Sequence, residues 1–600
     1  MTNTKKLLNS AQNPNPYFMS TAEDFFKSKV LGHPSGLFVL FFTEMWERFS
    51  YYGMRALLVM FFTASLMEEG WAWPREHAMA LFGSYTALVY LSTLIGGYMA
   101  DKKIGYRMAV VIGALLMTMG HAAMAIETHF SVYLGLTLLV VGSGFFKPNM
   151  TSIISVMYEE HQEKKDGAYT IFYMGVNAGA FLGILLCGYL GEKVGWSWGF
   201  GLAGIFMLFG MLQFWFAQGI FGDVGKKPVA SELKAAEEAN ADGDKRAHFT
   251  AWQNAVIVIC SVLGLTWILN QPASKISNGS FNVLDFEIFG IDGNSATILF
   301  ALGLFLVLLV YRLTLYSKIT REKMLAVTFF AFLTIFFWGI FEQAPGTLTI
   351  FARDYTNRVL EGDAGFLFKV VNSLMTLVPL AIITWVLFLL SKQTFAKYPF
   401  SNVFLGLSFV IIWAIAIWML NTEFQKDVAE IPASWFGVLN SLFIITFAPL
   451  FSKWWESKYN PSANVKFGIG MTLLGLGMAV VAYGSRNIAP GAQTASVSII
   501  WLILVYLFHT LGELCISPVG LSYVSKLVPA RMIAFMFGVW YLAIAIGMKL
   551  AGMFGENVDR IANESGISYF FWMLTLIAIG LGVFSVIMQP LIKKLMHGVR

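Results

Sequence analysis

Apolar runs of about 20 residues follow one another along the chain, with short polar segments between them. At a rise of about 1.5 Å per residue, a run of this length forms a helix that crosses the hydrocarbon core of a bilayer. The runs lie at residues 36–64, 79–100, 108–127, 131–155, 168–191, 198–220, 252–270, 296–316, 325–346, 367–390, 402–420, 435–455, 466–484, 498–524, 533–554 and 569–592. The pattern therefore predicts an all-α polytopic membrane protein with about 16 spans.

These runs are predicted to form two six-helix bundles and two inserted helical hairpins. Two neighbouring pairs of runs carry no carboxylate at membrane depth, which indicates peripheral insertions. Without them the chain divides into six and six spans, as in transporters built from repeated halves. The predicted domains are a cytoplasmic N-terminal segment at 1–34, a bundle at 35–222, a linker with the first hairpin at 223–323, and a bundle at 324–600 that contains the second hairpin at about 366–421.

The composition agrees with a membrane protein and predicts its orientation. Hydrophobic residues make up 57% of the chain and charged residues 13%, a balance that excludes a soluble globular protein. Lys and Arg gather in alternate loops, such as 101–107 and 316–323, so the positive-inside rule predicts cytoplasmic termini. This distribution also argues against nucleic-acid binding. The three cysteines show neither metal-ligand nor disulfide spacing.

The segment EMWERFSYYGMR places charged residues inside the first predicted span. Glu44, Glu47 and Arg48 are spaced i, i+3, i+4, and Tyr51 and Arg55 continue the same helix face. Each unpaired charge at membrane depth costs about 2.5–3.5 kcal/mol on insertion scales, so this face must meet partners or a wet cavity. Two acids and two arginines exceed what a structural salt bridge needs. The pattern predicts a transporter.

Three further charged residues lie deep in predicted spans, each close to a proline: Lys147, Glu342 and Glu513. Proline bends a membrane helix and frees backbone groups that can line a cavity. The alternative for each residue is a purely structural bond between two helices. Together with the charged first span, these positions favour a transport pathway over a structural membrane protein.

The charged first span resembles the ExxERFxYYG signature of the proton-dependent oligopeptide transporters (POT/PTR), a family of the major facilitator superfamily. Other segments resemble the family in the same order along the chain: GGYMADKKIGYR the loop after the second helix, VGSGFFKPN the fourth helix, FFWGIFEQ the seventh, IPASWFGVLNSLFIITFAPLF the eighth and GELCISPVGLSYVSKLVP the tenth. The resemblance implies the major facilitator fold. The hairpin expected between the seventh and eighth helices departs from the family pattern, and the sequence leaves its role open between a lipid-facing buttress and a contact surface.

Carried over by position, the resemblance implies a role for each motif residue. Proton coupling would rest on Glu44, Glu47, Arg48, Lys147 and Glu342. Peptide binding would involve Arg48, Tyr51, Tyr52, Arg55, Tyr90, Lys147, Asn177, Trp338, Asn440, Glu513, Ser517 and Trp540. The inner gate would include Asp101 and Arg107.

The implied function is proton-coupled symport that imports di- and tripeptides by alternating access across a bacterial-type cytoplasmic (inner) membrane. The alternative is a transporter of the same fold for another zwitterion or anion, such as a peptidomimetic, nitrate or an amino acid. An enzyme is not expected, because the sequence shows no nucleophile–base arrangement and no metal-ligand constellation. The expected partners are peptide, protons and the lipid bilayer, with no cofactor, metal or nucleic acid. A monomer is expected, with an oligomer left open.

Overall fold

The computed structural model describes residues 28–228, 249–527 and 533–599. Most of the predicted N-terminal segment and of the charged linker lies outside these residues. Fifteen helical segments of the described chain are long and apolar enough to cross a membrane. Helix α2 (Ser35–Thr63), 29 residues long, is a further helix of spanning length that carries the charged segment. The prediction of an all-α polytopic membrane protein is confirmed.

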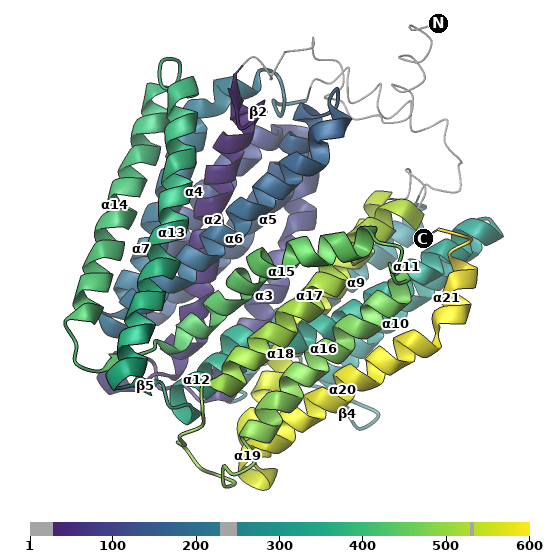
Figure 1. Ribbon diagram of the computed structural model, residues 1–600. Helices are drawn as coiled ribbons and strands as arrows, with labels where there is room; N and C mark the ends of the chain where they lie inside the picture. Colours follow the sequence, from purple (N-terminus) through teal and green to yellow (C-terminus); the bar gives the residue numbers. More distant parts are fainter. Residues whose placement is uncertain (1–27, 229–248, 528–532, 600) are drawn as a thin grey trace, which may run out of the picture.

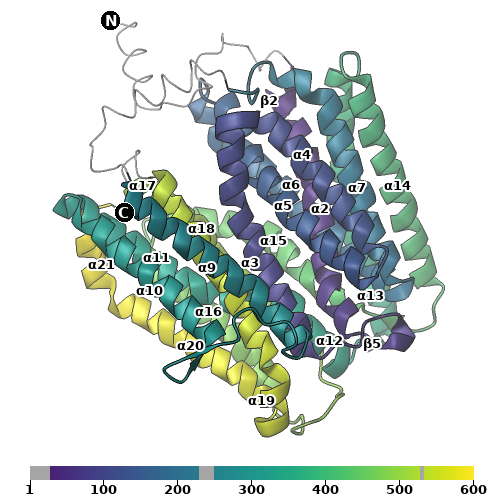
Figure 2. The ribbon, with the colours of Figure 1, turned by 180° about the vertical axis from the view of Figure 1, so that it is seen from behind.

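Two groups of helices pack around separate centres (Figures 1 and 2). The first group, called here the N-terminal bundle, consists of α2, α3 (Arg75–Met99), α4 (Tyr106–Met124), α5 (His129–Met157), α6 (Gln162–Lys193) and α7 (Trp196–Ala217). The second group, the C-terminal bundle, consists of α11 (Lys318–Phe341), α15 (Val438–Glu456), α16 (Ala463–Gly484), α17 (Ile500–Leu527), α18 (Ile533–Glu556) and α20 (Ile567–Ile587). Helix α2 packs on α6 and α7, whereas α16 packs on α17 and α20.

Two helical hairpins and several short elements complete the fold. The hairpins are α9 (Ala251–Ile276) with α10 (Gly293–Thr314), and α13 (Gly362–Thr394) with α14 (Pro399–Phe424). The short helices are α12 (Thr349–Tyr355), α19 (Val558–Ser565), α21 (Gln589–Leu595), the 3₁₀ turns η3 (Leu66–Glu68), η5 (Gln218–Phe221) and η8 (Ala433–Gly437), and the π turns η4 (Ala100–Ile104) and η7 (Ala344–Leu348). The strands form antiparallel pairs, β1 (Lys29–Val30) with β2 (His33–Pro34), β3 (Glu287–Ile288) with β4 (Ile291–Asp292), and β5 (Val359–Leu360) with β6 (Ala429–Glu430).

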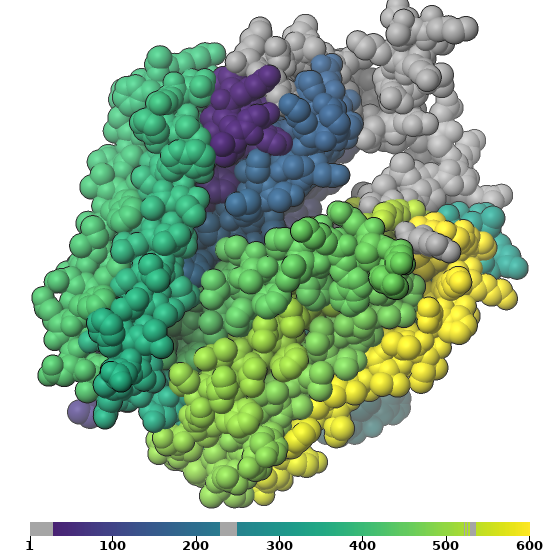
Figure 3. Space-filling view, viewed as in Figure 1, coloured from purple at the N-terminus to yellow at the C-terminus, as the bar shows by residue number. Residues whose placement is uncertain are grey.

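The two bundles converge at the end that holds β5, α12 and α19, which we call the closed end, and they separate toward the opposite end, where α21 lies (Figure 1). In the space-filling view the molecule is hollowed between the blue helices of the N-terminal bundle and the green helices of the C-terminal bundle on that opposite side (Figure 3). The charged helix α2 runs through the N-terminal bundle and is buried over nearly its whole length.

Close backbone contact fixes the position of α2 against α6. A Cβ added to Gly179 would lie 2.1 Å from the carbonyl oxygen of Met45, and one added to Gly183 would lie 2.2 Å from that of Phe49. Small residues at such positions let membrane helices approach closely, because lipid supplies little hydrophobic force to drive them together. This contact fixes the charged face of α2, which contains Arg48, against the interior of the bundle.

The second hairpin packs on the N-terminal bundle, although it is inserted in the sequence of the C-terminal one. Phe409 of α14 meets Phe42 and Trp46 of α2 edge to face, with ring centroids 5.7 and 5.6 Å away. The Ser401 hydroxyl donates a hydrogen bond to the Gln213 carbonyl of α7 at 2.8 Å. These contacts attach the hairpin to the N-terminal bundle, and the two roles that the sequence left open both stay predictions.

We expect Phe409→Ala to lower the thermal stability of the detergent-solubilised protein. Phe409 is 3% exposed, and truncating a buried Phe costs about 3–5 kcal/mol in protein cores because it leaves a cavity. The matched control is Phe366→Ala on the same hairpin, since Phe366 is 65% exposed. Fluorescence-detected thermal unfolding should show a lower midpoint for Phe409→Ala alone. Equal midpoints would contradict tight packing of the hairpin on α2.

Candidate functional site

The charged face of α2 forms a compact ion cluster within the N-terminal bundle. The Arg48 Nε donates a hydrogen bond to Glu44 Oε1 at 2.7 Å and lies 3.0 Å from Glu47 Oε2. Neither oxygen of Glu47, which is 0% exposed, has a hydrogen-bond partner among the described residues. One guanidinium is thus shared by two buried carboxylates, as the i, i+3, i+4 spacing predicts, but only Glu44 is hydrogen-bonded to it.

A second ion pair connects α2 to the C-terminal bundle. The Arg55 Nη1 donates to Glu342 Oε2 at 2.9 Å, and both side chains are buried. Glu342 immediately follows the last residue of α11, where the chain passes into the π turn η7. The proline of that turn cannot continue regular helical hydrogen bonding, which places the carboxylate at a helix break, as its sequence context predicts. The Arg55 guanidinium also lies 5.5 Å from the ring centroid of Tyr51 and 5.0 Å from that of Tyr52.

Lys147 lies beside aromatic rings. Its Nζ is 4.3 Å from the ring centroid of Tyr51 and 5.1 Å from that of Tyr90, within the range of a cation–π contact. In the part of the chain that the structure describes, no carboxylate oxygen forms an ion pair with this ammonium group. The implied partnership of Lys147 with the α2 acids therefore has no ion-pair contact in this conformation, although Glu47 and Glu44 are close enough to interact with Lys147 electrostatically.

Glu513 of α17 is held by a polar group of a neighbouring helix. The Asn440 amide of α15 donates to Glu513 Oε2 at 3.0 Å and to the Thr510 hydroxyl oxygen at 3.0 Å. Arg55 and Glu342 are close enough to interact electrostatically with Glu513. The implied pair of Glu513 and Asn440 is thus brought together. Thr510, one turn before Glu513, completes it and was not singled out from the sequence.

The other implied binding residues occupy the same bundles. Asn177 of α6 is buried, and its amide donates to the Tyr173 carbonyl at 2.9 Å. The Ser517 hydroxyl oxygen is buried without a hydrogen-bond partner among the described residues. Trp338 of α11 packs edge-on against Phe337 and Phe341, and Trp540 of α18 is buried close to Gly520.

The two implied gate residues lie around the turn η4. Asp101 belongs to this turn and is exposed. The Arg107 guanidinium donates to the carbonyl oxygens of Gln218 at 2.7 Å and Gly222 at 2.6 Å, so it fixes the segment that follows α7. The gating role of both residues stays a prediction.

The closed end carries a second charged cluster, which the sequence analysis missed. Arg75 of α3 pairs with Asp354 of α12 at 2.8 Å and with Asp559 of α19 at 3.0 Å. Arg353 pairs with the same Asp354 at 2.7 Å and donates to the Thr63 hydroxyl of α2 at 3.1 Å. Both arginines thus join the N-terminal bundle to elements beyond α11. Both arginines lie between the predicted apolar runs. Hydropathy does not predict which connecting segments contact each other, so no pattern in the sequence marks this cluster.

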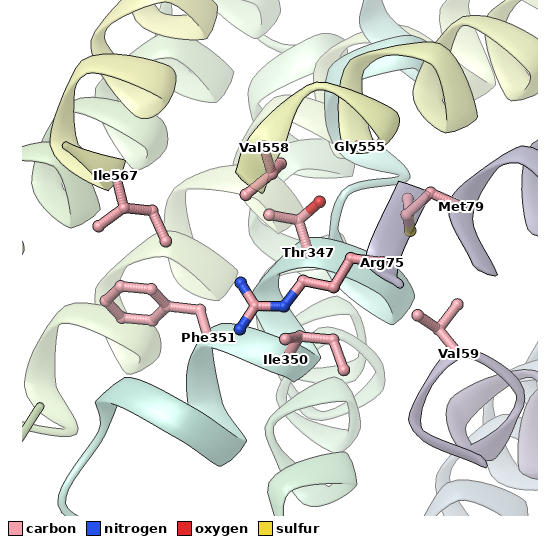
Figure 4. A pocket seen from close by; sticks show the side chains of 9 residues that line it. All are labelled: Val59, Arg75, Met79, Thr347, Ile350, Phe351, Gly555, Val558 and Ile567. Carbon is pink, nitrogen blue, oxygen red and sulfur yellow. The ribbon is translucent and has the colours of Figure 1, made fainter. Parts of the chain in front are cut away.

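Figure 4 shows the Arg75 guanidinium among apolar side chains of both bundles, around a cavity of about 10 Å³. Its lining residues are Val59, Arg75, Met79, Thr347, Ile350, Phe351, Gly555, Val558 and Ile567. A cavity of this volume holds at most a single water molecule. The cavity at the closed end is therefore too small for a peptide-sized molecule in this conformation.

A carboxylate of α6 forms a further contact between the N-terminal bundle and the turn η8. Glu192 accepts hydrogen bonds from the backbone amides of Ala433 at 2.8 Å and Ser434 at 2.9 Å, at the start of the turn η8. Nearby, Glu430 pairs with Lys193 and, at 3.1 Å, with Arg358. Burial alone would raise the pKa of Glu430, but the hydrogen bond and charge of Lys193, with the charge of Arg358, lower it below its ordinary value.

The polar core between the closed end and the hollow can bind a molecule with two opposite charges. The N-terminal bundle supplies Arg48, Arg55 and Lys147, and the C-terminal bundle supplies Glu342 and Glu513. Among the described residues, no group of His, Cys, Asp and Glu side chains is arranged to hold a metal ion. These side chains can bind charged groups and can exchange one ion-pair partner for another.

The chain is similar to known peptide transporters. The family model PTR2, the POT family, matches residues 107–237 and 406–573. The peptide transporter YePEPT of Yersinia enterocolitica is 30% identical over 537 residues, 88% of each chain. A di-/tripeptide transporter of Lactococcus lactis subsp. cremoris is 28% identical over 95% of this chain and 98% of that one. The crystal structure of a peptide transporter POT in complex with sulfate superposes with a TM-score of 0.68 at 28% identity, over 95% of this chain and 97% of that one.

We expect the Arg55–Glu342 pair to show strong energetic coupling. Arg55→Met leaves Glu342 buried without its partner, which costs about 3–5 kcal/mol for a buried pair. The double change Arg55→Met/Glu342→Leu removes both charges and should destabilise less than the two single changes together. A double-mutant cycle on the free energy of unfolding in detergent measures this difference.

The control cycle combines Arg55→Met with Glu423→Gln. Glu423 lies on the second hairpin and bonds to Tyr189 and Lys426, so it shares no partner with Arg55. The effects of these two changes should add. Additive effects in the Arg55–Glu342 cycle would contradict the cross-bundle pair.

Proposed function

This chain belongs to the POT family, and on that premise we propose that it is a proton-coupled symporter that imports di- and tripeptides by alternating access. The observation that carries the proposal is the polar core, in which cations of the N-terminal bundle face a hydrogen-bonded carboxylate of the C-terminal bundle. A peptide zwitterion needs two such poles on facing helices. The relatives named as peptide transporters support the substrate class.

The peptide's two ends would bind at opposite poles of the core. Glu513, held by Asn440, would receive the ammonium end. Lys147, which forms no ion pair with an acid among the described residues, would attract the carboxylate end with Arg48 and Arg55. Around these poles, the backbone and side chains of the peptide would contact Tyr51, Tyr52, Tyr90, Asn177, Trp338, Ser517 and Trp540.

Proton coupling would centre on the ion cluster of α2. Burying a charged carboxylate without hydrogen bonds costs free energy. Because Glu47 accepts no hydrogen bond among the described residues, its protonation gives up the fewest stabilising interactions. Protonation of Glu47 or Glu44 would loosen Arg48, which could then turn to the peptide carboxylate. Glu342 would act as a second coupling group, because its ion pair with Arg55 joins the two bundles.

In alternating access, the end that is now closed would open and the opposite end would close. The present conformation is closed around Arg75 and Glu192, and opening there requires their cross-bundle bonds to break. Asp101 and Arg107 would help to close the other end. We propose that this other end, with both termini, faces the cytoplasm across a bacterial inner membrane, with domains at 1–34, 35–222, 223–323 and 324–600. The whole proposed site lies within one chain, which would therefore transport as a monomer.

Uptake of labelled dialanine into proteoliposomes tests the proposal. With an inside-negative, acid-outside gradient, we expect accumulation above that of empty liposomes, because the gradient drives protons and peptide together. Folded protein, confirmed by a monodisperse elution profile, that gives no such accumulation would overturn the peptide assignment. Uptake of an amino acid or an anion instead would assign the fold to another substrate.

The variant Glu47→Gln should separate proton coupling from peptide binding. Because a glutamine side chain does not exchange a proton, gradient-driven uptake should fall at least ten-fold, while peptide counterflow stays measurable. Glu423→Gln is the matched control, a buried carboxylate outside the polar core, and it should keep driven uptake. Full driven uptake by Glu47→Gln would show that the proton binds elsewhere.

A further inference from the structure

Lys549 of α18 is a buried intramembrane lysine with no part in the proposed binding site. The residue is 2% exposed. Its ammonium group donates to the Ser84 hydroxyl of α3 at 2.8 Å and to the Gln271 side-chain oxygen of α9 at 2.6 Å. The lysine therefore bonds at once to the N-terminal bundle and to the first inserted hairpin.

The same glutamine also reaches an acid on α18. The Gln271 amide donates to both carboxylate oxygens of Glu556, at 3.1 and 2.9 Å. One turn further along α9, Lys275 pairs with Glu556 at 2.9 Å and also with Glu76 of α3. We call this set of bonded side chains the seam network: Glu76, Ser84, Gln271, Lys275, Lys549 and Glu556.

The hairpin helix α9 supplies the central members of the seam network. Lys549 and Glu556 lie seven residues apart on α18, so two helical turns separate them on one face. Gln271 of α9 bridges them with both ends of its amide. A charged residue of a membrane helix must face a partner or water, and α9 supplies partners to both charges.

The seam network lies along a close contact between α3 and α18, one helix from each bundle. A Cβ added to Gly83 of α3 would lie 2.7 Å from the Cα of Gly552 of α18, and the reverse holds as well. Ser84 follows Gly83 directly, and Lys549 precedes Gly552 by about one turn. Glu76 is next to Arg75 of the closed-end cluster. The network therefore continues the closure at Arg75 along the α3–α18 contact.

We propose that the seam network is a latch through which the hairpin α9–α10 stabilises the conformation closed at Arg75, with Lys549 and Gln271 as its positioning residues. Opening that end tilts α3 away from α18, and the bond from Lys549 to Ser84 then breaks. Because α9 is bonded to both helices, the hairpin resists this separation. Weakening the latch shifts the protein toward the conformation that is open at Arg75.

Distance measurement between two spin labels tests the latch on the whole chain. The labels are placed at Met67→Cys and Gln493→Cys, two exposed positions on either side of the closed end, with the three native cysteines replaced by alanine. In Lys549→Met and in Gln271→Leu, the fraction of long distances should at least double relative to the parent, because both changes remove the bond between Gln271 of α9 and Lys549 of α18. Lys549→Arg keeps a donor and should restore most of the parent distribution.

The matched control is Lys369→Met. Lys369 is a buried lysine of the other hairpin, and it donates to the backbone oxygen of Lys426 outside the seam. This variant should keep the parent distances. If Lys549→Met does not fold, the distances in Gln271→Leu and Lys275→Gln test the latch instead. Lys275 lies at the partly exposed end of the network, where the fold accommodates a substitution more easily.

Parent-like distances in the folded seam variants would overturn the latch. The distance measurement needs no substrate, so a negative result for the latch is distinct from a negative result for peptide transport. The inference rests on the proposed function only in that opening of this end is taken as a step of transport.

Discussion

The cost of burying charge in a membrane is the constraint on which this structure depends. Arg48 is bound by two acids of its own helix, and Arg55 is bound by an acid of the other bundle. Since each of these charges would be unfavourable alone, the fold must keep α2 and the end of α11 in positions that pair Arg55 with Glu342. The glycine contacts between α2 and α6 serve this geometry. Rearranging the pairs is then the natural way to couple binding to movement.

The two inserted hairpins lie in different relations to the bundles. The first hairpin is bonded to α3 and α18, one helix from each bundle, through Gln271 and Lys275. The second packs on α2 and α7 through Phe409 and Ser401. Neither hairpin contributes a residue to the polar core as described. The first hairpin thus connects the two bundles, whereas these contacts of the second are with the N-terminal bundle alone.

The sequence predicts the helices well, because apolar runs of spanning length and the i, i+3, i+4 spacing of Glu44, Glu47 and Arg48 depend only on local order. The contact of Asn440 with Glu513 followed from the family resemblance. The pairing of Arg55 with Glu342 did not follow, because these residues are 287 positions apart and meet only when the bundles touch. Arg75 was missed for the same reason, because it lies between two predicted spans and its partners lie on other elements. Lys549 was visible as a charge inside the predicted span 533–554, but its partners on α3 and α9 could not be predicted from its own segment.

The second hairpin is an arm that the C-terminal half of the sequence extends onto the N-terminal bundle. The chain leaves α12, packs two helices against the other bundle, and returns to η8, so the arrangement resembles a domain swap within one molecule. Its outgoing and returning segments meet as the strand pair β5–β6, with Val359 opposite Glu430. If one bundle rotates against the other, the backbone on the C-terminal side of the strand pair β5–β6 must therefore change conformation. A fragment cut between the two bundle sequences would also carry its partner's arm, so the halves of this protein are interlocked modules.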